Sequence, residues 1–495
     1  ELTVSGWRER GFHSVLRSGD TRSESLIAGM ILLAKQYPFP PNSKIPDSIK
    51  LGITRKNQCV SGENFSDYAR DYPYGGMPFA VTGLSDQEYA LLAGWVKQGA
   101  VITDESVTLT GGEKESLQQW ESFFNRDDNR SKLVARWLYE HLFMATLYFP
   151  DLDGKLRFFE LIRSSTPPGR DVIPISTVFP NEDPEQPFFY RIRPIVGNIL
   201  HKRRMPYPLN HAKQRRINEL FFTHEWPVSD LPGYSYAERV NPFATFAAIP
   251  AYARYRFMLD DAEYYVRNVI HGPVCRGQIA TDVIRDRFWV LFQNPESDPF
   301  ITNNAYQHQA VPLLEMPGQN DDPLAMGEEW LRYLSHHNDY LAQRRSQYVL
   351  QYPGGASLDH LWDGDNRNKD ALLTIARHYD SASVARGLIG DIPQTLWLMD
   401  YPLLERTYYI LVVNYNVFGN VAHQLLTRLY FDLIRNSSEH NFLRLIPDGQ
   451  RTDILHDWYQ HSGKLKFGIF YENIDDVSPS AERFATEDPK QELAL

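Results

Sequence analysis

The residues best suited to chemistry lie in one short segment near the middle of the chain. Residues 271–276 read His-Gly-Pro-Val-Cys-Arg. A cysteine followed by an arginine, with a histidine four residues before it, has the composition of an activated thiolate, because nearby positive charge lowers the pKa of a thiol. A packed turn, with Cys275 as a small hydrophobic side chain, is the alternative that sequence physics favours. The candidate catalytic residues here are His271, Cys275 and Arg276.

A second polar group within apolar surroundings lies at His423. It belongs to residues 416–430, which read as a helix of mostly apolar side chains. A histidine in such a helix is more often a hydrogen-bonded core residue than a ligand. His423 is nevertheless the fourth candidate catalytic residue.

Residues 201–216 carry six Lys or Arg residues and no acid, although the formal net charge of the chain is −11. One interpretation is a solvated start of a helix, and the other is a contact for anionic phospholipid head groups. Nucleic acid is a poorer partner, because the field of the whole chain is negative. The candidate membrane-binding residues are Lys202, Arg203, Arg204, Lys213, Arg215 and Arg216.

Common catalytic signatures are absent from the sequence. The chain has no P-loop, no Gly-x-Gly-x-x-Gly, no His-Glu-x-x-His and no Gly-x-Ser-x-Gly. Cys59 and Cys275 are its only cysteines, which excludes a disulfide-rich scaffold and a four-cysteine zinc site. No apolar run reaches the length of about 18 residues that a membrane-spanning helix needs, so no transmembrane helix is expected.

The elements that must position these residues indicate an α+β fold, without an evident internal repeat. Hydrophobic residues make up 42% of the chain and charged residues 23%, which is typical of a globular protein. Ser85 and Glu88 predict a capping box, Gly99 predicts the end of that helix, and residues 104–112 read as a polar linker. Periodicity predicts helices over 113–125, 130–148, 322–349 and 403–435, the last broken near Gly419, and strands over 155–163, 188–195, 288–292, 372–378 and 464–471.

Four motifs, in order along the chain, resemble the bacterial fatty acid cis/trans isomerase family. They are Met205-Pro206-Tyr207, Asn241-Pro242-Phe243, residues 272–278, and residues 417–421 followed by His423-Gln424. The resemblance implies a periplasmic, haem c-containing isomerase that converts cis double bonds of membrane fatty acyl chains to trans during stress. It implies unsaturated fatty acids and phospholipids as partners, reached by peripheral membrane contact, and no nucleic acid.

The resemblance also implies the domain organisation and the cofactor. Residues 1–102 resemble a partial cytochrome c-like helical unit, followed by a large mixed α+β isomerase body over residues 103–495. The loop methionine of a cytochrome c commonly ligates haem iron. Met77 is the matching residue, with a loop anchor packed under the helix as the other interpretation, and Met205 is a weaker candidate.

The sequence departs from the family pattern in one respect. It lacks the Cys-x-x-Cys-His motif through which the family attaches haem c. It begins with Glu1 rather than Met, and no signal peptide is present in it. We therefore expect an incomplete representation of a longer protein, at the N-terminus and at the C-terminus, with a haem-less relative as the alternative.

The expected mechanism is haem-assisted transient weakening of the π bond. A plain carbon–carbon double bond has no acidic proton and no leaving group, so rotation needs the π bond weakened for a moment. An electron-poor centre can do that, and the resemblance implies that ferric haem is this centre. The alternative function is a periplasmic c-type cytochrome, for electron transfer or sensing, with a lipid-binding domain.

Overall fold

The computed structural model divides the chain into two compact units, residues 1–107 and residues 108–495, which are described separately. The described residues are 5–6, 15–16, 25–39, 48–49, 60–62, 64–79, 82–101, 107–154, 156–197, 204–272, 287–317, 326–378, 381–393, 395–416, 419–459, 478–486 and 488–494.

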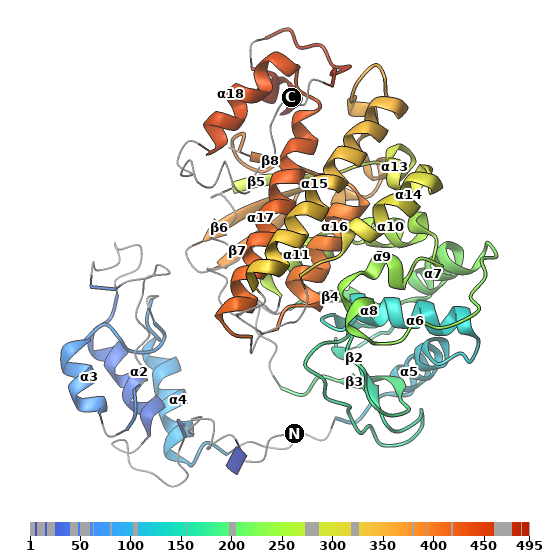
Figure 1. Cartoon of the computed structure of the whole chain (residues 1–495). Helices are drawn as coiled ribbons and strands as arrows, with labels where there is room; N and C mark the ends of the chain where they lie inside the picture. The colour runs from blue at the N-terminus through green and yellow to red at the C-terminus, as the bar shows by residue number, and fades with distance from the viewer. Residues whose placement is uncertain are drawn as a thin grey trace. The chain divides into compact units, whose positions relative to one another are not determined.

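The described part of the first unit contains helices and no strand. They are α2 (Leu26–Gln36), α3 (Phe65–Asp71) and α4 (Asp86–Lys97), drawn in blue in Figure 1. The predicted capping box is confirmed, since the Ser85 N–H donates to a Glu88 carboxylate oxygen at 2.8 Å and the Glu88 N–H donates to Ser85 Oγ. Just after α4, Gly99 has a φ of 89°, which confirms the predicted end of the helix.

The second unit begins with two helices and a four-stranded sheet. Helices α5 (Gly111–Phe124) and α6 (Asn129–Leu142) precede the strands. The strand order is β3-β2-β1-β4, with β4 parallel to β1 and the other pairs antiparallel. The strands are β1 (Thr146–Tyr148), β2 (Phe159–Ser164), β3 (Phe189–Pro194) and β4 (Pro206–Pro208).

The helix predicted over residues 130–148 is wrong at its C-terminal end. Helix α6 ends at Leu142, and residues 146–148 form strand β1. The side chains of this stretch are apolar enough for either element, so periodicity alone does not separate them. Pairing with a distant segment decides in favour of the strand, because the Thr146 N–H donates to the Met205 carbonyl at 2.7 Å.

A second sheet repeats the topology of the first. Its order is β7-β6-β5-β8, again with three antiparallel strands in sequence and the fourth parallel to the first. No internal repeat is evident in the sequence that would correspond to this shared strand order. The strands are β5 (Arg287–Phe292), β6 (Leu372–His378), β7 (Ser381–Arg386) and β8 (Thr395–Met399).

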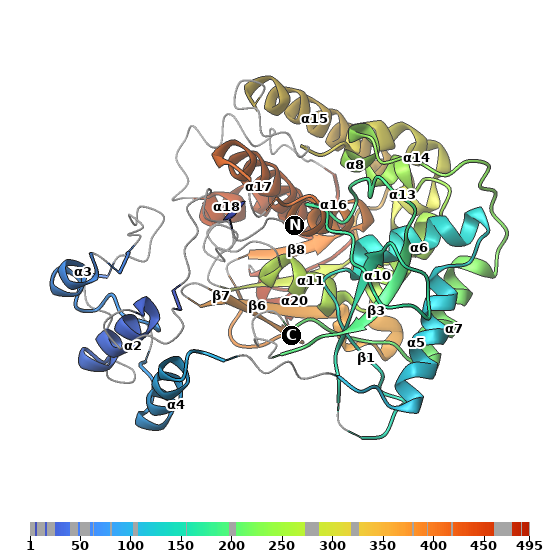
Figure 2. The same ribbon diagram turned by 90° about the horizontal axis from the view of Figure 1, so that it is seen from below.

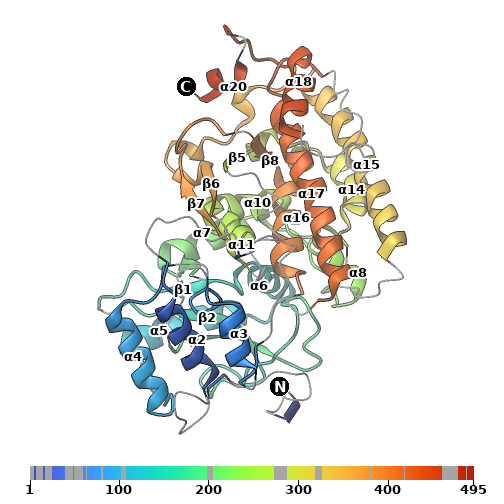
Figure 3. The same cartoon turned by 90° about the vertical axis from the view of Figure 1, so that its left-hand side faces the viewer.

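Helices surround this sheet and confirm the mixed α+β class. Helix α17 (Val421–Leu443) lies beside α15 (Met326–Gln351) and against β8, and α11 (Ala262–His271) packs against β7 (Figures 1, 2 and 3). The helices of the second unit also include α7 (His211–Phe222), α8 (Tyr236–Val240), α9 (Pro242–Thr245), α10 (Ala251–Asp260), α13 (Pro299–Thr302), α14 (Asn304–Ala310), α16 (Tyr401–Tyr408), the π-helix η7 (Tyr409–Val413), α18 (Asp448–Tyr459) and α20 (Pro489–Ala494). Short 3₁₀ turns are η2 (Pro295–Ser297), η3 (Val311–Leu314), η4 (Leu358–His360), η5 (Gly364–Asn366) and η6 (Lys369–Ala371).

The long helix predicted over residues 403–435 is confirmed as two segments with a break. Helix α16 continues into η7, and α17 starts at Val421, after Gly419. The strand predicted over residues 464–471 lies outside the described residues.

Both faces of the second sheet are buried. Phe288 and Trp397 belong to the main core, with ring centroids 4.3 Å apart. Trp289 and Leu398 point to a smaller core that includes Trp458. Burial on both faces explains why β5 and β8 are nearly continuous apolar runs.

Candidate functional site

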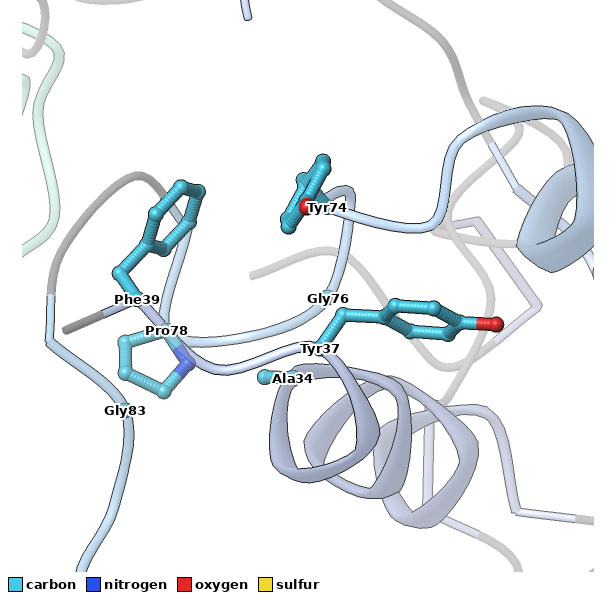
Figure 4. A pocket seen from close by; sticks show the side chains of 7 residues that line it. All are labelled: Ala34, Tyr37, Phe39, Tyr74, Gly76, Pro78 and Gly83. Atoms are coloured by element: carbon cyan, nitrogen blue, oxygen red, sulfur yellow. The ribbon is translucent and has the colours of Figure 1, made fainter. Parts of the chain in front are cut away.

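An aromatic pocket lies in the first unit, beside Met77. Its enclosed space is only about 10 Å³, roughly the room of one water molecule. The ring of Tyr74 lies 5.3 Å from that of Phe39 and 6.1 Å from that of Tyr37, measured between centroids. Figure 4 shows these side chains around the loop at Gly76. The lining residues are Ala34, Tyr37, Phe39, Tyr74, Gly76, Pro78 and Gly83.

The loop that carries Met77 is held close to helix α2. The Met77 N–H donates to the Met30 carbonyl at 3.0 Å. A Cβ on Gly76 would lie 2.3 Å from the backbone nitrogen of Ala34, so only glycine permits this approach. The Met77 residue itself is 46% exposed. This exposure disfavours the packed-anchor interpretation, and its role as a haem ligand stays a prediction.

The residues of this unit do not make a complete haem site. Met77 is not among the residues that line the pocket, although its neighbours Gly76 and Pro78 are. The sequence of residues 1–107 contains a single histidine, His13, and a single cysteine, Cys59, and both lie outside the described residues. The pocket is also smaller than the range of about 300–1,000 Å³ usual for ligand sites. We therefore assign no chemical step to haem in this chain.

His271 is the last residue of α11, and the structure places it next to the π-helix η7. The following Gly272 donates its N–H to the Asn268 carbonyl at 2.7 Å. A Cβ on Gly272 would lie 3.6 Å from a methyl group of Val412. Cys275 and Arg276 lie outside the described residues, so their proposed reactivity stays a prediction.

His423 is a buried histidine at the start of α17. It is 2% exposed, and its Nε2 accepts the N–H of Asn416 at 2.9 Å. Its own backbone N–H donates to Asn420 Oδ1 at 3.1 Å. This is the geometry of the hydrogen-bonded core histidine that the sequence favoured, and a catalytic role for His423 stays a prediction.

Gly272, His423 and Arg239, which belong to or lie next to three of the four sequence motifs, are close to η7. Asn414, which ends this helix, accepts a hydrogen bond from Asn181 Nδ2 at 2.8 Å. Asn414 Nδ2 donates to the Arg239 carbonyl at 3.2 Å, two residues before Asn241-Pro242-Phe243. The motifs at Gly272 and His423 border the same segment. Because π-helices recur at functional sites, η7 is the best-defined candidate centre of the second unit.

Met205 lies elsewhere, in the main core. It is fully buried, and its N–H donates to Thr146 Oγ1 at 3.1 Å. Its neighbour Tyr207 donates to Asp261 Oδ2 at 2.9 Å, where α10 meets α11. A haem ligand must face its iron, so this position leaves Met205 the weaker candidate.

Sequence reasoning missed a buried pair close to η7. His141 Nε2 lies 3.1 Å from Glu405 Oε2, and both side chains are fully buried. The Tyr409 hydroxyl donates to Glu140 Oε2 at 2.7 Å, which joins η7 to α6. The available signal was a Glu-His dipeptide within an apolar helix, but its partner is 264 residues away.

A second group of buried charges lies at the start of α16. Asp298 accepts the N–H groups of Phe300 and Tyr401, at 2.9 and 3.0 Å. Burial, and then the charge of Asp400, raises the pKa of Asp298 to about 7. Arg344 Nε donates to Asp400 Oδ2 at 2.9 Å.

Arg254 contrasts with Arg344. It is 1% exposed, and its guanidinium lies 5.3 Å from the ring centroid of Tyr401. Its Nε and Nη1 have no hydrogen-bond partner in the described part of the chain.

The structure separates the basic run into residues with different roles. Lys213 Nζ lies 2.5 Å from Asp261 Oδ2, and Arg216 Nε lies 2.7 Å from Asp260 Oδ2. Arg215 is exposed, and the Arg204 guanidinium lies 4.6 Å from the ring of Phe158. Lys202 and Arg203 lie outside the described residues.

Comparisons with known proteins add a family assignment. The model of the family described as fatty acid cis/trans isomerase matches residues 1–495. No curated protein and no solved structure matches the chain. In the described segments, no helix is both long and apolar enough to cross a bilayer.

Proposed function

The chain belongs to the fatty acid cis/trans isomerase family, a family of enzymes, and from this premise we propose that it converts cis double bonds of membrane fatty acyl chains to trans without moving the bond. The observation that carries the proposal is the extent of the family match, which covers both units from residue 1 to residue 495. The trans isomer is the more stable one, so the reaction needs no ATP or NAD.

We assign the two units different parts in this function. Residues 1–102 form a partial cytochrome c-like unit, supported by the capped helix α4 and by the exposed Met77 beside an aromatic pocket. Residues 103–495 form the isomerase body, with its centre near η7, Gly272 and His423. The periplasm is the proposed location, and phospholipids are the proposed source of substrate.

The family resemblance implies haem, which would supply an electron-poor centre if it were bound, but we route no step through it because the residues of this chain do not make a complete haem site. In the described part of this chain, Met77 is the residue that would ligate it. The chain as given has no Cys-x-x-Cys-His, so it should bind no covalent haem. A pyridine haemochrome assay on acid–acetone-extracted protein tests this, and a retained c-type spectrum would contradict it.

Gas chromatography of fatty acid esters tests the activity. Phospholipid vesicles with cis-unsaturated chains are incubated with the protein, with and without added haem, and heat-denatured protein serves as the control. A rise in trans isomers at an unchanged bond position supports the proposal. Haem-reconstituted, folded protein that leaves the isomer ratio unchanged would favour the electron-transfer alternative.

A further inference from the structure

Two exposed aliphatic residues flank the paired strands β2 and β3 at one end of the first sheet. Strands β2 and β3 are antiparallel, and the Ile195 N–H donates to the Phe158 carbonyl at 2.9 Å. The residues just before β2 and just after β3 therefore leave the sheet at the same end. Leu156 is 51% exposed and Val196 is 64% exposed, so both aliphatic groups are presented to solvent at this end.

One basic side chain, that of Arg204, lies at the same end. The Arg204 guanidinium lies 4.6 Å from the ring of Phe158, two residues from Leu156. Lys202 and Arg203 precede Arg204 in the sequence, and Lys155 precedes Leu156. The exposed acids nearby are Asp151 and Asp153, and Asp151 lies 2.9 Å from His211 Nδ1 in an ion pair. The local sequence is thus cationic in a chain of net charge −11.

Two other residues of the basic run, Lys213 and Arg216, are committed to internal contacts, whereas Arg215 is exposed. The side chains of Lys213 and Arg216 are 12% and 26% exposed and are paired with Asp261 and Asp260. These two residues hold α7 against the corner between α10 and α11. Because their charges are paired with carboxylates, these two residues should contribute little to binding an anionic membrane surface.

We propose that the end of the β2–β3 ladder, formed by Leu156, Val196 and Arg204, is a docking surface for an anionic lipid bilayer. Leu156 and Val196 enter the boundary between head groups and acyl chains, and Arg204 contacts lipid phosphates. The inference rests on the proposed function, because the acyl chains of a bilayer lie behind its head-group surface, which the enzyme must contact to reach them.

Vesicle sedimentation tests the surface without relying on catalysis. The probes are phosphatidylcholine vesicles with and without phosphatidylglycerol. The double variant Leu156→Ser/Val196→Ser should bind the anionic vesicles about tenfold more weakly, which corresponds to about 1.4 kcal/mol. Arg204→Gln should reduce the salt dependence of binding, because a charged contact is screened as ionic strength rises.

The matched control is Leu331→Ser/Leu350→Ser on α15, where the residues are 66% and 73% exposed. This variant should bind vesicles as the unaltered protein does. If the Leu156→Ser/Val196→Ser variant is folded and binds normally, or if both double variants lose binding equally, the docking surface is wrong.

Activity separates this inference from the proposed function. The Leu156→Ser/Val196→Ser variant should turn over dispersed free fatty acid normally and vesicle lipid more slowly. If the unaltered protein isomerises neither substrate but the vesicle-binding difference persists, the proposed function fails and the docking surface stands. Equal loss of turnover on both substrates would place these residues in the active site and overturn the docking role.

Discussion

The imidazole of His141 and the carboxyl group of Glu405 form a hydrogen-bonded pair in the interior of the second unit. His141 Nδ1 lies 2.7 Å from the Trp137 carbonyl, which can only accept, so Nδ1 carries a hydrogen. Nε2 lies 3.1 Å from Glu405 Oε2, and that contact requires a second proton. The pair is therefore neutral as a whole, whether the proton resides on the ring or on the carboxyl group, as burial demands.

This pair lies at the junction of three helices. The hydroxyls of Tyr264 on α11 and Tyr408 on α16 both donate to the His141 carbonyl, at 3.0 and 2.9 Å. Trp137 Nε1 donates to Glu405 Oε1 at 3.3 Å. These hydrogen bonds thus connect α6, α11 and α16 close to η7.

We predict that His141→Leu destabilises the protein far more than Glu405→Gln. Leucine leaves the Glu405 carboxylate buried without its proton partner, which should cost about 3–5 kcal/mol of unfolding free energy. Glutamine can donate to His141 Nε2 and accept from Trp137, so its cost should be about 0.5–1.5 kcal/mol. Urea unfolding measures both, and equal losses would contradict a neutral, hydrogen-bonded pair.

Two buried arginines should respond differently to the same substitution. Arg344→Met removes the partner of Asp400 and should cost about 3–5 kcal/mol, because a buried charge is left unpaired. Arg254→Met removes a guanidinium whose Nε and Nη1 have no hydrogen-bond partner among the described residues, and it should be neutral or stabilising. Thermal unfolding of the two variants is the measurement. A loss in Arg254→Met as large as in Arg344→Met would show that Arg254 compensates a charge through space.

Asp298 and His337 should make opposite contributions to the pH dependence of the unfolding free energy. The pKa of Asp298 is raised from 3.8 to about 7, so its contribution is present below about pH 4 and is lost as pH rises through about 7. Burial first, and then the charge of Arg406, lowers the pKa of His337 from 6.5 to about 3. Its contribution is present above about pH 6.5 and is lost as pH falls through about 3.

The two effects oppose each other between about pH 4 and pH 6.5. Asp298→Asn should therefore lose stability on acidification more steeply than the unaltered protein. His337→Gln should instead gain stability as pH falls below about 7. Urea unfolding at a series of pH values compares the slopes, since the substitutions also shift each curve by a constant. Parallel curves for all three proteins would show that neither group titrates as described.

Gly76→Ala should unfold or open the first unit, whereas Gly94→Ala should not. A Cβ added at Gly76 would lie 2.3 Å from the backbone nitrogen of Ala34. Ala34 belongs to α2, so its backbone cannot move away without displacing that helix. Gly94 lies within α4 and has nothing within 4 Å of that position, so alanine should stabilise it by about 0.5–1 kcal/mol. Limited proteolysis of residues 25–101 measures both, and similar protection in the two variants would refute the close approach at Gly76.

Local features could be predicted from the sequence with good accuracy. The capping box at Ser85 and Glu88 and the stop at Gly99 depend on residues within one or two helical turns. Strands β2, β3, β5 and β6 were predicted for the same reason, because alternation and apolar runs are local patterns. Strand β1 was missed, since only its pairing partners distinguish it from a continuation of α6.

The sequence by itself determined the caps, most long elements and the family, because each is written in consecutive residues. Only the tertiary structure decided which charges are free and which are paired. His141 meets Glu405 across 264 positions, and Lys213 and Arg216 of the basic run meet acids 44 to 48 positions away. Such contacts depend on how helices pack, and packing places side chains from distant segments together by shape and burial rather than by spacing along the chain.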